Sequence, residues 1–347
     1  MYLRNAWYMA MWAHDLPTNA LTARTLLGEP LVFLRDERGV AQALQDRCPH
    51  RLVPLSLGTY LPSGRVRCIY HGLEFDGSGA CVHNPHGNGR IPPAARARSY
   101  PVIERHGQIW VWMGEKESDP ARLPDYHFLE AGEGKLLSVQ DHLIMDAGID
   151  LIVENLLDLS HVSFLHEGLL GSSATVAADI MLEQGERELT VRRWMPGVPS
   201  PELFDIVLPR KGELIDMWFD MRWQAPGALT NDVGATSPGG DRQRGYRIQG
   251  AHILTPQTAT STHYHFAAAL HLPPDHDHTR NAAIGPELSR IRRYAFEAQD
   301  APIIQAQQRT ILNAAPEVLT PILLDIDAGP VRYRRMMAAL LTEEHSV

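Results

Sequence analysis

Hydrophobic and polar positions divide the chain into two regions of different character. Up to about residue 115, short apolar runs alternate with glycine and proline, which is typical of short strands joined by tight turns. The expected strands are residues 31–34, 41–45, 66–70 and 109–113. We therefore predict an all-β domain over residues 1–115, joined through the charged stretch 114–124 to a second domain over residues 116–347.

The second region combines helical and strand periodicities. Apolar side chains recur at the period of a helix over residues 150–165, and a long helix interrupted by Pro302 is expected over 287–312. Long antiparallel strands are predicted over 186–193, 215–223, 246–254 and 261–270, with 254–261 as a turn. Long strands with helices before and after them predict an α+β fold, in which helices cover an antiparallel sheet.

Composition narrows the classes of function. Of the 347 residues, 44% are hydrophobic and 21% are charged, which is ordinary for a globular protein with a sizeable core. The net charge of −9 argues against a nucleic-acid partner, because phosphate binding needs a basic surface. No run approaches the about 20 apolar residues of a membrane span, and Asp15 and Pro17 interrupt the apolar N-terminus early. We therefore expect a cytoplasmic protein with no membrane partner, whose three cysteines are reduced.

Two of the three cysteines lie in short motifs that also contain a histidine. Cys48 and His50 form a C-x-H motif, and Cys68 and His71 form a C-x-x-H motif that begins after seventeen intervening residues. Two thiolates and two imidazoles can hold zinc in a tetrahedral site. The same ligands in two loops of a β domain fit a Rieske centre better, in which thiolates hold one iron of a 2Fe–2S cluster and imidazoles hold the other. We favour the cluster and keep structural zinc as the alternative.

A second group of potential metal ligands lies in residues 154–166. Asn155, Asp158 and His161 recur every three residues, which places them on one face of the predicted helix. His166 follows five residues after His161, about 140° further round an ideal helix. Both imidazoles can therefore bind one metal only if the helix ends or unwinds between them.

Two imidazoles and one carboxylate form the facial triad of non-heme Fe(II) oxygenases, which leaves positions open for O2. Asp300 is the candidate carboxylate, because Pro302 is expected to kink the helix beside it and so direct its side chain inward. Taken alone, a helix with one aspartate and two histidines is more often a solvated surface. The predicted iron site therefore depends on its combination with the cluster motif.

The combination of both motifs resembles the catalytic subunits of Rieske non-heme iron oxygenases. The stretches RNAWYMAMWAHDL, YHGLEFDGSGACVHNP, ENLLDLSHVSFLH and HILTPQTATSTHY are similar to the group that contains vanillate O-demethylase, dicamba O-demethylase and toluenesulfonate methyl-monooxygenase. The resemblance covers nearly the whole chain. It implies a Rieske domain followed by a helix-grip, START-like catalytic domain, with one 2Fe–2S cluster and one Fe(II) in each subunit.

The resemblance also implies roles for individual residues. The implied cluster ligands are Cys48, His50, Cys68 and His71, and the implied iron ligands are His161, His166 and Asp300. Asp158 is implied to connect His161 to the cluster ligand His71 of a neighbouring subunit, with Asn155 near the iron. Asn231 and His252 are implied to hydrogen-bond a substrate carboxylate. For His252 the alternative is a satisfied core histidine, since strand alternation can place it inward in either case.

The activity implied by the resemblance is that of a monooxygenase. It uses O2 to oxidise a methyl or methoxy group of a small aromatic acid, by O-demethylation or by methyl hydroxylation. The family assembles as a homotrimer and takes electrons from NADH through a separate flavin and iron–sulfur reductase; the sequence agrees, because no G-x-G-x-x-G motif follows a predicted strand. Two alternatives remain: an aromatic-ring cis-dihydroxylating dioxygenase, and a Rieske electron-transfer protein with a ligand-binding module.

Five further residues of ligand type receive no functional role. Cys81 is expected to be a buried apolar thiol, and His83 and His86 are expected to lie in a surface loop. His263 and His265 share one face of a predicted strand and are interpreted as surface or core polar residues.

Overall fold

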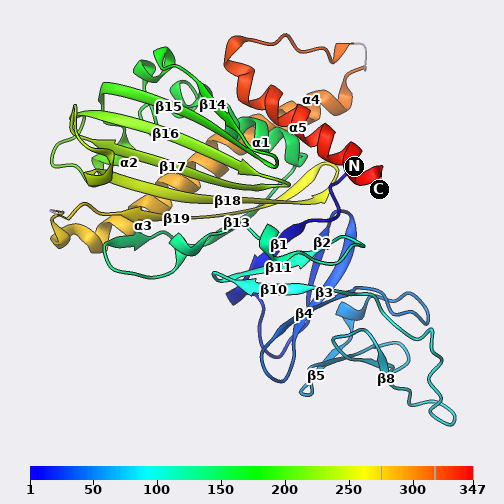
Figure 1. Cartoon of the computed structure of the whole chain (residues 1–347). Coiled ribbons are helices and arrows are strands. Elements are labelled where there is room, and N and C mark those ends of the chain that lie inside the picture. The colour runs from blue at the N-terminus through cyan, green and yellow to red at the C-terminus, as the bar shows by residue number, and fades with distance from the viewer. Residues whose placement is uncertain (275, 316–317, 347) are drawn as a thin grey trace. The chain divides into compact units, whose positions relative to one another are not determined.

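The computed structural model describes residues 1–274, 276–315 and 318–346 (Figure 1). The chain forms two compact units. The first consists of Met1–Leu123 with Thr255–Thr258, and the second consists of Pro124–Leu254 with the residues from Ala259 onward. Within the described residues, no helix is both long and apolar enough to cross a membrane.

The first unit consists of short antiparallel strands, as predicted. Their bounds are β1 Trp7–Trp12, β2 Thr22–Leu26, β3 Glu29–Arg35, β4 Ala41–Gln45, β5 Thr59–Leu61, β6 Arg65–Arg67, β7 Glu74–Phe75, β8 Cys81–His83, β9 Ser99–Tyr100, β10 Val102–Arg105 and β11 Gln108–Trp112. They form three sheets with the strand orders β1-β11-β10, β2-β3-β4-β9 and β5-β6-β7-β8. Short 3₁₀ turns cover Ala13–Asp15, Leu55–Leu57 and Pro120–Arg122.

The predicted strand over 66–70 is wrong at its C-terminal end. Strand β6 ends at Arg67, and Cys68 begins a tight loop in which its carbonyl accepts a hydrogen bond from the Gly72 amide at 2.9 Å. The apolar residues at 69 and 70 that suggested a longer strand are exposed on this loop. The chain therefore leaves the sheet at the first residue of the C-x-x-H motif.

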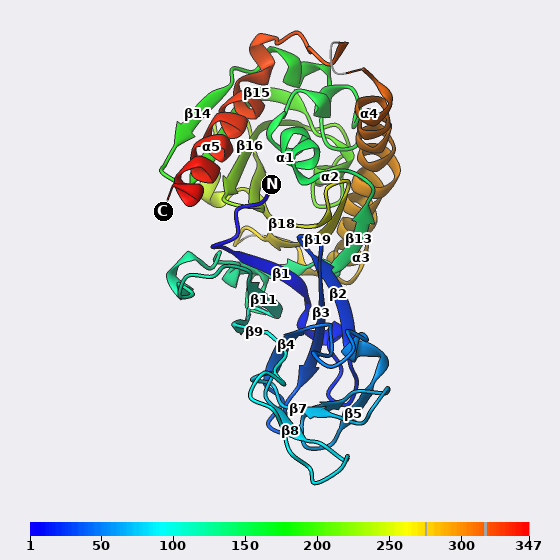
Figure 2. The same cartoon turned by 90° about the vertical axis from the view of Figure 1, so that its right-hand side faces the viewer.

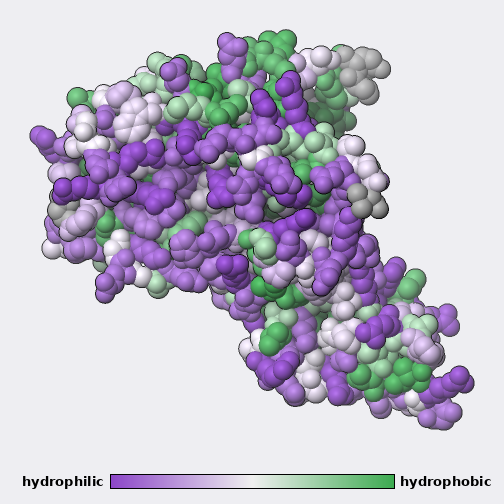
Figure 3. All heavy atoms as spheres, in the orientation of Figure 1, coloured by the Kyte–Doolittle hydropathy of each residue, from purple (hydrophilic) through white to green (hydrophobic). Residues whose placement is uncertain are grey.

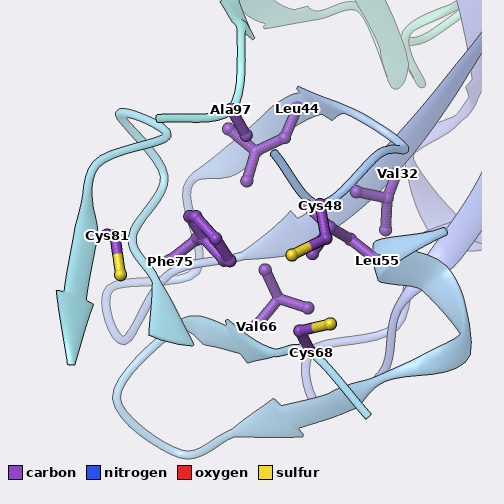
Figure 4. Packing of buried hydrophobic residues seen from close by; sticks show 9 residues of the cluster. All are labelled: Val32, Leu44, Cys48, Leu55, Val66, Cys68, Phe75, Cys81 and Ala97. Carbon is purple, nitrogen blue, oxygen red and sulfur yellow. The ribbon is translucent and has the colours of Figure 1, made fainter. Parts of the chain in front are cut away.

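A compact apolar cluster fills the part of this unit that contains all three cysteines (Figure 4). Its buried members are Val32, Leu44, Cys48, Leu55, Val66, Cys68, Phe75, Cys81 and Ala97. Cys48 and Cys68 lie beside Leu55 and Val66, whereas Cys81 lies apart from them, beyond Phe75 (Figure 4). The cluster therefore separates the two motif cysteines from the third.

The second unit is built on one large antiparallel sheet. The bounds of its strands are β12 Lys135–Leu137, β13 Asp141–Met145, β14 Met181–Gln184, β15 Glu188–Pro199, β16 Leu214–Gln224, β17 Ala228–Thr236, β18 Tyr246–Thr258 and β19 Ser261–His271. The strand order is β12-β19-β18-β17-β16-β15-β14, and β13 also pairs with β19. The last residues of β18, Thr255–Thr258, count with the first unit.

Helices cover one face of this sheet, as the α+β prediction expected. Their bounds are α1 Ile149–Leu157, α2 Glu202–Asp205, α3 Asn281–Arg293, a π-helical segment Tyr294–Asp300, α4 Ala301–Asn313 and α5 Ala328–His345. Short 3₁₀ turns cover His127–Leu129, His161–Ser163, Ser173–Ala177, Arg242–Arg244, His278–Arg280 and Asp325–Asp327. Helix α1 lies between α5 and α4 and packs on β16 (Figure 2).

Sequence analysis missed β17 and shortened β18. Strand β17 carries the polar run Thr230, Asn231 and Asp232 in its middle, so its alternation of buried and exposed residues is interrupted. It pairs with β16 and β18 along its length, with Asn231 opposite Gly250. Strand β18 continues to Thr258, which leaves only two residues for the predicted 254–261 turn. Asn231 therefore lies inside a central strand, in a stretch for which no strand was predicted.

Both predicted helices differ from the observed ones in ways that affect the site. The helix predicted over 150–165 ends at Leu157, so Asp158 and His161 do not share a helical face with Asn155. The helix predicted over 287–312 is a continuous rod of three segments, in which α3 passes into the π-helical segment and then into α4. Pro302 lies in the first turn of α4, directly after the π-helical segment, and has no N–H to donate to a carbonyl of that segment.

Candidate active site

Two loops of the first unit present the C-x-H and C-x-x-H motifs in matching conformations. In each loop the cysteine carbonyl accepts a 2.9 Å hydrogen bond from the amide four residues on, from Leu52 to Cys48 and from Gly72 to Cys68. The donors Leu52 and Gly72 have φ values of 62° and 69°. This left-handed conformation is ordinary for glycine but uncommon for leucine. The two motifs therefore form two equivalent loops.

The thiols of these loops are buried and the imidazoles face outward. Cys48 and Cys68 are each 2% exposed, whereas His50 is exposed and His71 is half-buried, with their ring centroids 4.5 Å apart. Burial raises the pKa of the Cys48 thiol to about 11, and the neighbouring Cys68 thiol adds to the rise. Thiols inside and imidazoles outside fit a Rieske cluster, in which each pair of ligands holds its own iron.

In the second unit, the structure brings His161, His166 and Asp300 together. Nε2 of His166 lies 3.1 Å from Oδ1 of Asp300, and Nε2 of His161 lies 3.7 Å from the same oxygen. One ligand atom from each residue lies within 4.8 Å of the others. Ligand atoms about 2.1 Å from one metal and at adjacent corners of its coordination shell are about 3 Å apart, which is close to the 3.1 Å between Nε2 of His166 and Oδ1 of Asp300. The three side chains fit a facial triad.

Hydrogen bonds set the orientation of both imidazoles. Nδ1 of His166 is 2.8 Å from Oε1 of Gln299, whose Nε2 donates to the Leu165 carbonyl at 2.8 Å. Nδ1 of His161 contacts the main-chain carbonyl of Asp158. Because both Nδ1 partners are acceptors, each ring carries its proton on Nδ1 and leaves Nε2 with a lone pair for a metal.

The local fold explains how two histidines five residues apart meet. Helix α1 ends at Leu157, where the carboxylate of Asp158 accepts a hydrogen bond from the Ser160 amide at 2.9 Å. Such a side-chain turn competes with helical hydrogen bonding. A single 3₁₀ turn, His161–Ser163, then changes the chain direction before His166. The helix ends before His161, and not between the two histidines as the sequence predicted.

Asp300 reaches the site from a π-helical segment. It is the last residue of Tyr294–Asp300 and is 3% exposed. The wider helical turn places a residue where an α-helix would not, and such segments occur often at functional sites. Nδ2 of Asn155, in the last turn of α1, donates to Oδ1 of Asp300 at 3.3 Å. Asn155 thus holds the carboxylate of Asp300. The carboxylate of Asp158 lies at the partly exposed end of α1.

The electrostatics of the site favour a cation. Burial lowers the pKa of His161 despite the opposing charge of Asp300. At His166, burial works in the same direction, but the hydrogen bond and charge of Asp300 reverse it into a net rise of the pKa. Because the carboxylate of Asp300 raises the pKa of His166, it favours positive charge between these two side chains. A divalent metal supplies such a charge.

One cavity joins this group to both proposed substrate residues. His161, His166 and Asp300 line it together with Asn231 of β17 and His252 of β18, and most of its other lining residues are apolar. Burial, and secondly the charge of Arg292, hold the pKa of His252 well below its ordinary value. Nδ1 of His252 is 2.5 Å from the Tyr264 hydroxyl.

Two buried polar atoms in this cavity lack a partner. Nε2 of His252 and Oδ1 of Asn231 make no hydrogen bond to any residue that the structure describes. Buried polar atoms are rarely left unpaired unless a water or ligand completes them. His252 is therefore not fully satisfied as a core histidine, which was the alternative interpretation.

The remaining residues of ligand type lie outside both groups. Cys81 is buried, as expected, and burial raises the pKa of its thiol. His83 ends strand β8 and is exposed, whereas His86 lies in an exposed loop with Nε2 2.8 Å from the His71 carbonyl. His263 and His265 are buried, and the ring of His142 stacks against both.

Three residues at the site were missed by sequence analysis. Gln299 orients His166, Tyr264 contacts His252, and Arg292 lines the cavity. Gln299 could have been found from the sequence, because it lies next to the predicted ligand Asp300. The other two are ordinary strand and helix residues whose environment depends on tertiary packing.

Comparison with known proteins places both units in known families. Residues 6–101 match the Rieske [2Fe-2S] domain, and residues 145–343 match the vanillate O-demethylase oxygenase C-terminal domain. The chloroacetanilide N-alkylformylase oxygenase component of Rhizorhabdus wittichii is 35% identical over 350 residues, covering 99% of this chain and 97% of that protein.

Solved structures of dicamba monooxygenase match over both units. The form bound to 3,6-dichlorosalicylic acid has a TM-score of 0.90 and 32% identity, covering 100% of this chain and 99% of that one. The form with non-heme iron and dicamba has a TM-score of 0.81 and 30% identity, covering 99% of both chains.

This chain belongs to the family of Rieske non-heme iron oxygenases whose catalytic domain is that of the vanillate O-demethylase oxygenase. It is the oxygenase component of a monooxygenase system and carries a Rieske 2Fe–2S cluster and a mononuclear iron. The zinc alternative and the pure electron carrier are therefore wrong. The domain boundary predicted between residues 115 and 116 lies between the two matched regions and stays a prediction.

Proposed function

We propose that this chain oxidises a methyl or methoxy group on a small aromatic acid, by O-demethylation or by methyl hydroxylation. The observation that supports this most is that one cavity is lined both by the histidine–carboxylate group and by the polar pair Asn231 and His252. A ring acid with its anionic end at this pair presents its substituent to the other end of the cavity. Dicamba and 3,6-dichlorosalicylic acid, bound in the related structures, are aromatic acids of this kind.

We assign ligands to each metal site on the geometry given above. The assigned cluster ligands are Cys48, His50, Cys68 and His71, and the assigned iron ligands are His161, His166 and Asp300. When bound, the iron supplies the activation of O2. Gln299 and the carbonyl of Asp158 hold the imidazoles, Asn155 holds the carboxylate, and apolar walls keep water away from the reacting groups.

Substrate entry requires the cavity to widen. Its volume is about 60 Å³, which is less than the roughly 150 Å³ of a cavity that admits benzene. The walls include Leu156, Leu203, Phe219 and Phe296, which can change rotamer more readily than the metal-binding side chains. We therefore expect binding to shift these apolar residues and to leave the triad in place.

We further propose a homotrimer in which the cluster of one protomer serves the mononuclear iron of its neighbour through Asp158. The carboxylate of Asp158 lies at the partly exposed C-terminal end of α1, three residues before His161. Apolar side chains on the surface between α4 and α5 would suit a contact between protomers (Figure 3). The strongly exposed ones are Val318, Ile322, Leu323 and Leu324.

Electrons are proposed to come from NADH through a separate reductase, with O2 as the second substrate. Leu52 and Ile69, one in each cluster loop, are 63% and 66% exposed, so an apolar surface surrounds the outward-facing imidazoles. Such a surface suits the brief docking of a redox partner. A cytoplasmic location fits the three free cysteines, because a reducing compartment keeps thiols available to a cluster.

A second candidate function is oxidative N-dealkylation of a neutral anilide. It is favoured by the 35% identity to the chloroacetanilide N-alkylformylase component over nearly all of both chains. Ring cis-dihydroxylation, the alternative kept in sequence analysis, would make the chain a dioxygenase, which disagrees with the monooxygenase relatives that it matches. Dihydroxylation places both oxygen atoms of O2 in the product, whereas hydroxylation and either dealkylation use one.

The proposal is tested by turnover of the iron-loaded protein with a reductase, NADH and ¹⁸O2. With ortho-methoxybenzoate we expect the phenol and formaldehyde in equal amounts, and with para-toluenesulfonate a benzylic alcohol that contains one labelled oxygen. A diol with two labelled oxygens would contradict monooxygenation. Product from chloroacetanilides alone would favour the second candidate.

A further inference from the structure

A buried arginine lines the substrate cavity without a carboxylate partner. Arg292, in the last turn of α3, is 5% exposed and lies among the cavity-lining residues. Within the described part of the chain, no Asp or Glu oxygen lies within 4.0 Å of its guanidinium nitrogens. Its two arginine neighbours differ, because exposed Arg290 pairs with Glu202 and Arg293 pairs with Asp141.

The guanidinium has hydrogen-bonding capacity to spare. Nη2 of Arg292 donates to the Ala267 carbonyl of β19 at 3.2 Å, and Nε is buried without a partner among the described residues. Burial lowers the pKa of Arg292 to about 10, so the group still carries its charge at neutral pH. A buried charge without an opposite charge is costly, and a protein retains one where a ligand compensates it.

Missing side-chain volume at Gly250 lets Arg292 approach Asn231. A Cβ atom at Gly250 would lie 2.7 Å from Nη1 of Arg292 and 2.0 Å from Oδ1 of Asn231. Gly250 faces Asn231 across the β17–β18 pair. The carboxamide and the guanidinium therefore meet over one glycine, and any larger residue there would force them apart.

His252 lies two residues further along β18, on the same face of the sheet as Gly250. Burial raises the pKa of Tyr264 well above its ordinary value, so its hydroxyl keeps its proton and can donate to Nδ1 of His252. In that tautomer the unpaired Nε2 carries a hydrogen. Arg292 and His252 then offer an N–H from a cation and an N–H from a neutral imidazole at one end of an apolar cavity, where the carboxamide of Asn231 also lies.

We propose that Arg292 is the residue that determines specificity for a substrate with one carboxylate or sulfonate group, which it binds together with Asn231 and His252. This inference rests on the proposed function of the cavity and makes its substrate class more specific. A single cation without a second basic side chain matches a single negative charge. It favours an aromatic acid over a neutral anilide, since a neutral ring would leave the buried guanidinium uncompensated.

Ligand binding separates this role from a merely structural one. Calorimetry on the metal-loaded protein, without reductase, compares ortho-methoxybenzoate with its neutral methyl ester. We expect the wild type to bind the acid on the order of 100-fold more tightly than the ester, because the carboxylate of the acid pairs with the buried charge of Arg292. In Arg292→Gln the affinity for the acid should fall by about this factor and the affinity for the ester should not change. Arg292→Lys should recover part of the affinity for the acid.

Arg290→Gln is the matched control. It removes an arginine from the same helix, but one that is exposed and paired with carboxylates, so acid affinity should stay at the wild-type value. Equal affinity of the wild type for acid and ester would overturn the inference even if no Arg292 variant folds. So would an Arg292→Gln protein that keeps its preference for the acid.

Failure of this inference is distinguishable from failure of the proposed function. Arginine-dependent binding of the acid without any product would leave the anion site in place and refute the oxidation. Demethylation of ortho-methoxybenzoate at unchanged KM in Arg292→Gln would keep the oxidation and refute the role of Arg292. Para-toluenesulfonate, used as the second probe, should follow the carboxylate in every variant.

Discussion

Each functional histidine of the second unit is oriented by a hydrogen bond at Nδ1, the ring nitrogen that does not bind the metal or the substrate. Oε1 of Gln299 accepts a hydrogen bond from Nδ1 of His166, and the carbonyl of Asp158 accepts one from Nδ1 of His161. The hydroxyl of Tyr264 donates to Nδ1 of His252. All three residues line the cavity, and in each ring Nε2 is left for a ligand. The same arrangement serves two purposes, since a lone pair on Nε2 binds a metal and a hydrogen on Nε2 binds an anion.

At the residue scale, burial of His252 makes the stability of the protein pH-dependent. Its folded pKa lies well below 6.5, so its contribution to stability is complete above the unfolded value of about 6.5 and is lost as pH falls. Each pH unit below that value costs up to about 1.4 kcal/mol, because the unfolded chain takes up a proton that the folded chain cannot. His252→Gln should therefore lose less stability than the wild type between pH 7 and pH 5.5.

Urea unfolding at the two pH values measures this difference, which we expect to be about 1 kcal/mol. His345→Gln changes an exposed histidine at the end of α5 and serves as the control variant. An identical slope in His252→Gln and the wild type would contradict the lowered pKa of His252 in the folded protein.

At the element scale, the site is made where regular structure stops or changes. Helix α1 ends at Leu157 and frees the chain to turn before His161, and the π-helical segment ends at Asp300. Gln299, next to Asp300 in the π-helical segment, joins this segment to the chain that follows the His161–Ser163 turn, because it contacts both His166 and the Leu165 carbonyl. The hydrogen bonds of one side chain thus hold two of the three proposed ligands in register.

Gln299→Leu should weaken iron binding selectively. Without the acceptor at Nδ1, neither the orientation of the His166 ring nor the position of its proton is fixed. Such changes typically lower metal affinity by about 10–100-fold. Titration of the iron-free second site with Fe(II) measures the affinity, while visible absorption of the cluster reports on the first unit. Gln307→Leu alters an exposed glutamine of α4 and should leave both signals unchanged. Unchanged Fe(II) affinity in Gln299→Leu would contradict the orienting role.

The elements that sequence analysis predicted well are those whose pattern is local. The cluster loops have a distinctive spacing of Cys48, His50, Cys68 and His71, and long strands such as β16 are rich in apolar and aromatic residues. The end of α1 was misplaced, because a side-chain turn at Asp158 competes with an apolar pattern that continues beyond it. No local pattern marks a π-helical segment, and the apolar period of 287–312 runs through it unchanged.

At the scale of the whole molecule, the two metal centres lie in separate units of the chain. Asp158 is proposed to connect them between protomers, and the structure indicates how to remove its charge without disturbing the iron. Its contact with His161 uses the main-chain carbonyl, and an asparagine oxygen can still accept the hydrogen bond from Ser160. Asp158→Asn should therefore keep both the iron and the cluster.

Turnover of Asp158→Asn should nevertheless fall by about 10–100-fold, because the charged connection between the centres is lost. Oxidation of the reduced cluster by O2 in the presence of substrate, followed in a stopped-flow spectrometer, should slow by the same factor. Glu154→Gln, one turn earlier on α1 and paired with Arg334, is the matched control and should turn over normally. Normal turnover of a metal-replete Asp158→Asn protein would reject the bridging role.

Electron transfer between protomers is open to a test with mixed oligomers. A Cys48→Ser chain keeps its iron site but loses its cluster, and a His161→Ala chain keeps its cluster but loses its iron site, so each alone should be inactive. In random mixtures, half of the protomers have an intact iron site and half of their neighbours have an intact cluster. Activity of the random mixture should then return to about a quarter of the wild-type value, and mixed trimers isolated with two different affinity tags should show about a third.

The position of Asp158 in this mixture makes the test directional. Adding Asp158→Asn to the chain with the intact iron site should remove most of the restored activity, because Asp158 acts beside His161 of its own chain. Adding it to the chain with the intact cluster should have no effect, since that chain holds no iron for Asp158 to serve. Activity that never returns on mixing would mean that each cluster serves only the iron of its own chain, and the trimeric pathway would then have to be abandoned.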